Sequence, residues 1–127
     1  SYVQEIVYRA GDLKLNSRMG GIWFAETKQG VENFAISVRK TKVEGKPYYI
    51  NITNPKFFGY GFWRGYIEKI ENIRPIHVGR EALMNNLKFK GYDCIIISED
   101  TWNDTADEYS VTSKQFVIFS ESQATLL

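Results

Sequence analysis

Strand-like patterns dominate the chain. They fall in six segments: residues 5–9, 20–27, 46–55, 92–98, 108–113 and 114–121. In the third segment Tyr48, Ile50 and Ile52 share an apolar face, and Pro55 is expected to end the strand because proline cannot donate to a sheet ladder. The fourth is a continuous apolar run, which indicates a strand covered on both faces. The last two segments are expected to pair as a hairpin.

Three other segments repeat apolar residues at intervals of three and four, which is typical of helices. They are residues 29–39, 61–72 and 80–89. Gly91 follows the last of them as a natural stop. The glycine-rich stretch 59–65 follows no apolar strand, so we interpret it as an aromatic turn packed on the sheet and not as a phosphate cradle. The pattern predicts one α+β domain over residues 1–127.

Composition and charge narrow the classes of function. The 127 residues carry a net charge of +1, which gives no basic field of the kind that generic nucleic-acid binding needs. Cys94 is the only cysteine, so no internal disulfide and no cysteine-based zinc site can form. This fits a reducing compartment, and a cytoplasmic location is expected. No apolar run approaches the roughly 20 residues that a membrane span requires, so no membrane partner is expected.

Three common functional signatures are missing from the sequence. It has no Gly-x-Ser-x-Gly elbow, no P-loop and no Gly-x-Gly-x-x-Gly dinucleotide fingerprint. We interpret the single histidine, His77, as a surface or capping residue close to Pro75. Hydrolysis by a serine triad and nucleotide binding by either glycine motif are therefore not indicated.

Arg9 is the first candidate for a functional residue. It ends the first apolar segment and precedes the small pair Ala10-Gly11. A guanidinium at the end of a buried strand requires an anion. The residues alone leave two sources open: a carboxylate of the protein, such as Glu26 or Asp93, or a bound ligand.

Five stretches in a fixed order resemble the ADP-ribosyltransferase superfamily over nearly the whole chain. The similarity is greatest to the short, single-domain transferases of phage and mobile-element proteins. The stretches are YRAG (8–11), GIWFAETKQGVENFA (21–35), INITNP (50–55), KGYDCIII (90–97) and QFVIFSESQ (115–123). The resemblance implies a split β-sandwich of two small sheets with about three flanking helices. It also implies NAD as the substrate that donates ADP-ribose.

The resemblance assigns the NAD-binding residues position by position. Arg9 would hold the pyrophosphate, so that the anion of the opening strand is a ligand, and the main chain of Ala10 would grip the nicotinamide amide. Gly11, Ala25 and Phe34 also fall in the implied binding site. In the second stretch Phe24 is either part of the nicotinamide pocket or a core residue, and Trp23 is expected in the core. The hydroxyl that the family often carries is missing at Ala25, and Thr27 is the nearest replacement.

The C-terminal SESQ stretch supplies the catalytic residues that the resemblance implies, together with Arg9. Glu121 and Gln123 stand where many members of the family have Glu-x-Glu or Gln-x-Glu. On an extended chain both side chains would point to the same side and face one ligand. Gln123 would hold the ribose hydroxyl, but an amide cannot stabilise positive charge on the sugar as a carboxylate does. Glu121 would then supply that charge or deprotonate the acceptor.

Two classes of function follow from these assignments. The first is a mono-ADP-ribosyltransferase that releases nicotinamide and modifies a protein, with a nucleic acid or a small molecule as the alternative acceptor. The long polar loop at 98–108, with Trp102, is a candidate for contact with that acceptor, although Trp102 folded back onto the sheet is the competing interpretation. The second class is an inactive module of the same fold that binds NAD or a partner protein, with a phage-encoded inhibitor as a third interpretation. Asn54, Pro55, Gly91 and Asp93 are interpreted as structural.

Overall fold

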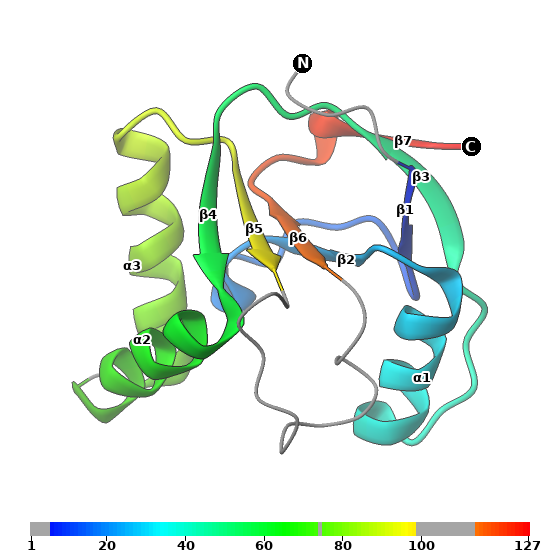
Figure 1. Ribbon diagram of the computed structural model, residues 1–127, viewed down its shortest axis with the longest axis horizontal. Coiled ribbons are helices and arrows are strands. Elements are labelled where there is room, and N and C mark those ends of the chain that lie inside the picture. Colours follow the sequence, from blue (N-terminus) through cyan, green and yellow to red (C-terminus); the bar gives the residue numbers. More distant parts are fainter. Residues whose placement is uncertain (1–5, 74, 99–113) are drawn as a thin grey trace.

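The computed structural model describes residues 6–73, 75–98 and 114–127 and shows an α+β fold (Figure 1). The strands are β1 (Ile6–Arg9), β2 (Ile22–Ala25), β3 (Lys46–Ile50), β4 (Pro55–Gly59), β5 (Cys94–Ser98), β6 (Gln115–Ile118) and β7 (Ala124–Leu126). The α-helices are α1 (Lys28–Arg39), α2 (Tyr60–Ile73) and α3 (Ile76–Phe89), and two short 3-10 helices cover Ser17–Met19 and Glu121–Gln123.

The strands form one mixed sheet in the order β4-β5-β6-β2-β1-β3-β7, where two separate small sheets were expected. Only β4 and β5 are parallel. The link between the two halves is the short antiparallel pairing of β1 with β2, in which Tyr8 lies opposite Ala25. This pairing joins the halves by hydrogen bonds, so the expectation of two independent sheets is wrong.

An inner core lies between the two halves of the sheet. Val7 of β1 and Ile50 of β3 pack in one buried cluster with Phe24 of β2 and Phe116 of β6. Because residues from both halves share this cluster, the bent sheet covers its own inner face. The curvature therefore supplies the packing that a second sheet was expected to supply.

A second core lies on the other face of the sheet, under α2 and α3. Trp63, Ile67 and Leu83 of these helices pack on Ile95 and Ile97 of β5. The intervening β5 residues belong to the inner core, so β5 is buried on both faces, as its continuous apolar run predicts. Helix α1 lies apart from α2 and α3 and contacts β1 and β2 (Figure 1).

The predicted strand 46–55 is interrupted by a turn. β3 ends at Ile50, and Pro55 begins the edge strand β4 and does not end a strand. The carboxylate of Asp93 fixes the turn, since it accepts hydrogen bonds from the main-chain N–H groups of Thr53 (2.8 Å) and Asn54 (2.9 Å) and from the Thr53 hydroxyl (2.8 Å). The structural interpretation of Asp93 is thus confirmed. Proline is accepted in β4 because an edge strand has a side that needs no donor.

The three predicted helices are present, with shifted starts. Thr27 caps α1, because its hydroxyl accepts the Gly30 N–H at 3.0 Å. Helix α2 runs through most of the glycine-rich stretch 59–65, so the prediction of an aromatic turn there is wrong, although Trp63 does pack on the sheet. Helix α3 begins four residues before its predicted start and includes Gly79, at a point where a Cβ would clash with Ile70 of α2.

Two expectations fall outside the described residues: the strand 108–113 with its hairpin, and the contact by Trp102. In the part of the chain that the structure describes, none of the helices has the length and apolar character needed to cross a bilayer.

Candidate functional site

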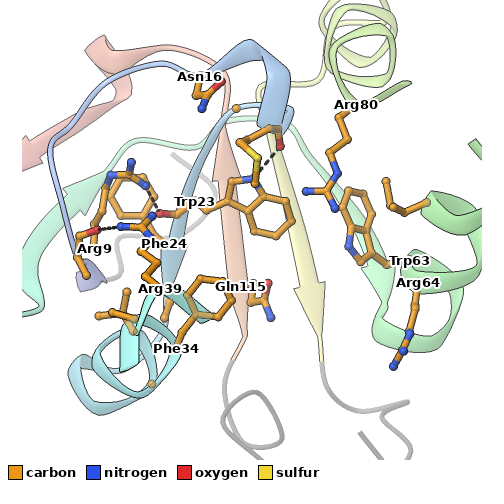
Figure 2. Close-up of a pocket in the computed structure, with 18 of the residues that line it drawn as sticks. Arg9, Asn16, Trp23, Phe24, Phe34, Arg39, Trp63, Arg64, Arg80 and Gln115 are labelled. Carbon is orange, nitrogen blue, oxygen red and sulfur yellow. Dashed lines mark hydrogen bonds between the residues drawn. The ribbon is translucent and has the colours of Figure 1, made fainter. Parts of the chain in front are cut away.

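A cavity of about 550 Å³ opens between α1 on one side and α2 and α3 on the other (Figure 2). Its floor includes residues of β2 and β6. A volume of this size is typical of sites for small molecules and cofactors. We call it the arginine pocket, because Arg9, Arg39, Arg64 and Arg80 line it.

Arg9 is half-buried at one end of the arginine pocket, and main-chain carbonyls hold its guanidinium. Nε donates to the carbonyl of Asp12 at 2.8 Å, and Nη1 donates to the carbonyl of Trp23 at 2.9 Å. The two carboxylates considered as partners are engaged elsewhere: Glu26 accepts the Lys114 N–H and Asp93 fixes the β3–β4 turn. Within the described residues no ion pair involves Arg9, so a protein carboxylate does not supply the anion.

Arg39 of α1 lies next to Arg9. Its Nη1 donates to the carbonyl of Ala10 at 3.3 Å, and Gly11 lies beside the same guanidinium nitrogen. Burial, and after it the charge of Arg39, lower the pKa of Arg9 from its ordinary value. Two like charges held this close in a partly desolvated place favour an anion between them. Ala10 itself is buried and lines the cavity.

The aromatic residues of β2 divide between the pocket and the core, in the opposite sense to the expectation. Phe24 is 2% exposed, and its ring packs edge-on against Tyr48 in the inner core, with ring centroids 5.5 Å apart. Trp23, expected in the core, is half-buried on the pocket side, where Nε1 donates to the carbonyl of Met19 at 2.8 Å. Its ring meets Trp63 edge-on with centroids 5.8 Å apart. Trp23 and Trp63 therefore form the aromatic wall of the pocket.

Gln115 is a lining residue that the sequence reasoning missed. It begins β6 and lies directly opposite Ala25 of β2. Directly opposed residues in an antiparallel pair project to the same face of the sheet, so the amide of Gln115 and the small side chain of Ala25 share the pocket face. Phe34 of α1 lines the same region and is 42% exposed. Arg9, Ala10, Phe24, Ala25 and Phe34 of the expected set thus line one cavity.

The structure does not bring Glu121 and Gln123 to this cavity. Residues 121–123 form a 3-10 helix and not an extended chain, so the expectation that both side chains face one ligand is wrong. Glu121 is exposed and accepts the Leu15 N–H at 3.0 Å. Gln123 accepts the Phe119 N–H at 3.1 Å and donates to the carbonyl of Asp93 at 2.8 Å. Their polar atoms bind the main chain and join the C-terminus to the rest of the sheet.

The charge balance of the arginine pocket is strongly positive. Four arginines line it, and Glu68 is the only carboxylate among its described lining residues. Glu68 lies 3.6 Å from Arg64 Nε, and both side chains are well exposed, so this pair is weak. The described residues contain no cluster of histidine, cysteine or carboxylate groups that would hold a metal ion. The cavity is therefore suited to an anionic, metal-free ligand that carries flat rings.

Compared with known proteins, the chain matches no family model, no curated protein and no solved structure. The assignment of function therefore depends on the residues and their geometry.

Proposed function

We propose that the chain binds NAD in the arginine pocket. The observation that carries the proposal is the pair Arg9 and Arg39, whose guanidinium groups are held together by main-chain carbonyls in a partly buried place. A pyrophosphate between them would relieve their mutual repulsion and accept paired, charge-assisted hydrogen bonds. NAD supplies such an anion, and the resemblance of the sequence to ADP-ribosyltransferases independently names it.

The rest of the cavity supports a flat, polar ligand of this kind. Trp23 and Trp63 offer ring surfaces against which nicotinamide or adenine would pack. Gln115 and Ala25 lie on the pocket face of the sheet, where the amide can hydrogen-bond a ribose hydroxyl and the small side chain leaves room for it. Together these groups account for phosphate, ring and sugar.

Calorimetry with NAD tests the proposal. The parent chain is expected to bind NAD, and Arg39→Met is expected to weaken binding by about tenfold or more, because a charge-assisted contact to phosphate is lost. Lys40→Met, on the residue that follows α1, is the matched control and should bind as the parent does. Absence of NAD binding by the folded parent chain would refute the proposal.

ADP-ribosyl transfer is the second candidate, and the position of Gln115 favours it. In this reaction the bond between nicotinamide and C1 of the ribose breaks, nicotinamide leaves with the bonding electrons, and an acceptor nucleophile bonds to C1 and loses its proton. Gln115 would orient the ribose but would not stabilise the positive charge that develops on it. We therefore expect slow turnover, with a protein as the proposed acceptor.

Mass spectrometry of free nicotinamide separates binding from transfer. Gln115→Glu places a carboxylate where the charge develops and is expected to raise nicotinamide release by about tenfold or more. Glu121→Gln should leave release unchanged. Nicotinamide release that stays at background in the parent chain and in Gln115→Glu, while both bind NAD, would leave only the binding function.

A further inference from the structure

The arginine pocket has a second cationic end, distinct from the end at Arg9 and Arg39. Figure 2 shows Arg80 of α3 and Arg64 of α2 beyond the two tryptophans, on the far side from Arg9. We propose that this end is a second anion subsite, which takes a phosphate monoester carried by a nucleoside. The inference names a substrate class for the pocket and so rests on the proposed function.

The structure fixes the position of Arg80 through the contact of α3 with the turn before β2. The Ser17 hydroxyl donates to Glu81 Oε2 at 2.6 Å. Gly20 has φ 82° and lies so close to the helix that a Cβ there would stand 3.4 Å from the carbonyl oxygen of Arg80. These contacts hold the first turns of α3, and with them the root of the Arg80 side chain, at the wall of the cavity.

Arg64 can join Arg80 at little energetic cost. Its pairing with Glu68 is long, at 3.6 Å, and joins side chains that are 59% and 66% exposed. Exposed pairs within one helix contribute on the order of 0.5 kcal/mol or less, so a ligand phosphate can replace the Glu68 carboxylate as the partner of Arg64. The second end then offers two guanidinium groups to one dianionic group.

The tryptophans between the two ends indicate what separates the two anions. Trp23 and Trp63 meet edge-on at 5.8 Å, between Arg9 and Arg39 on one side and Arg64 and Arg80 on the other. A ligand that spans the pocket must therefore carry a ring or sugar at this place and a further phosphate beyond it. Two sources fit this chemistry: a dinucleotide with an additional phosphate, as in NADP, and a separate nucleotide that binds beside NAD as the acceptor.

Calorimetry with matched ligand pairs tests the subsite. The first arm compares NADP with NAD, and the second compares AMP with adenosine, each added to protein saturated with NAD. In at least one arm the phosphorylated ligand is expected to bind about tenfold more tightly than its partner, because it gains charge-assisted bonds. Preference in the first arm assigns the phosphate to the dinucleotide, and preference in the second assigns it to an acceptor.

Variants connect that preference to the two arginines. Arg80→Met and Arg64→Met should each reduce the phosphate preference by at least about threefold, whereas Lys88→Met, on the exposed side of α3, should not change it. Because Arg80 is partly buried, Arg80→Lys serves as a second variant, and the melting temperature of each protein confirms that it is folded. A parent chain with no phosphate preference in either arm, or a preference that persists in Arg80→Met and Arg64→Met, would overturn the subsite.

The two proposals can fail separately. NAD binding that requires Arg39 but shows no phosphate preference would retain the proposed function and refute the subsite. If NAD does not bind, both arms are repeated without it. AMP or NADP binding that depends on Arg80 would then refute the proposed function and retain the subsite.

Discussion

The arginine pocket and the C-terminal turn (residues 120–123) are both rich in polar side chains, but they use them differently. In the C-terminal turn the Gln123 amide is bonded to the main chain of Phe119, Asn51 and Asp93, and the Glu121 carboxylate to that of Leu15. In the pocket, like charges lie together beside a cavity. A polar side chain whose atoms are bonded to the main chain stabilises the fold, whereas a group of like charges facing a cavity indicates a ligand.

The largest effect on stability is expected at Gln123. Gln123→Leu leaves the Phe119 N–H and the carbonyls of Asn51 and Asp93 without their partner, and the free energy of unfolding should fall by about 3 kcal/mol. Denaturant unfolding measures it. NAD affinity at a temperature where the variant is folded should not change. A large loss of NAD affinity without a loss of stability would return Gln123 to the functional site.

A somewhat smaller effect is expected at Asp93. Asp93→Ala removes the carboxylate that fixes Thr53 and Asn54 before β4, and unfolding should become easier by about 2 kcal/mol. Asp93→Asn is the matched control, because an amide oxygen keeps one acceptor and should recover part of the loss. Equal stability of both variants and the parent would show that the turn does not need the carboxylate.

Cys94, directly beside Asp93, reports how tightly this region is sealed. The side chain is fully buried, and burial raises the pKa of the thiol to about 12 from 9.0. The unfolded chain loses the thiol proton first, so between pH 9 and about 12 stability should fall by up to about 1.4 kcal/mol per pH unit relative to Cys94→Ala. Below pH 9 the two proteins should show the same pH dependence of stability. Rapid labelling of the native thiol would contradict the sealed core.

Glu121 should contribute less. Glu121→Gln retains an oxygen that can accept the Leu15 N–H, and stability should fall by no more than about 1 kcal/mol. Thermal unfolding measures the change.

The smallest effect on stability is expected at Arg39, and it gives the sharpest contrast. Arg39→Met removes the charge next to Arg9 together with one hydrogen bond at 3.3 Å, and these two effects oppose each other. The free energy of unfolding should therefore change by no more than about 0.5 kcal/mol, while NAD affinity falls. A loss of stability as large as that of Gln123→Leu would make Arg39 a structural residue and remove the contrast.

Local patterns in the sequence predict most of the elements. The continuous apolar run of β5 correctly indicates burial on both faces, and apolar spacing in α2 correctly selects Trp63 and Ile67 for the core. The join between β1 and β2 is a pairing between distant segments, so no local pattern could indicate one sheet instead of two. The early start of α3 was missed because Gly79 discourages a helix locally, and only its close contact with Ile70 explains it.

The binding side of the candidate site was better predicted than its catalytic side. Arg9 and its small neighbour Ala10 are recognisable because a charge at the end of an apolar strand requires an explanation. Arg39 and Arg80 lie on helices, where exposed arginines are common, and their convergence depends on how α1 and α3 pack. Gln115 could have been found from the strand pattern, since it begins the apolar run of β6.

The crystal structure of the chain with NAD bound tests the central claim most directly. The account predicts the pyrophosphate inside the arginine pocket, with its oxygens within hydrogen-bonding distance of the Arg9 and Arg39 guanidinium groups and a ring of the ligand against Trp23 or Trp63. NAD bound at the C-terminal turn, or in the pocket with no phosphate contact to either arginine, would contradict it.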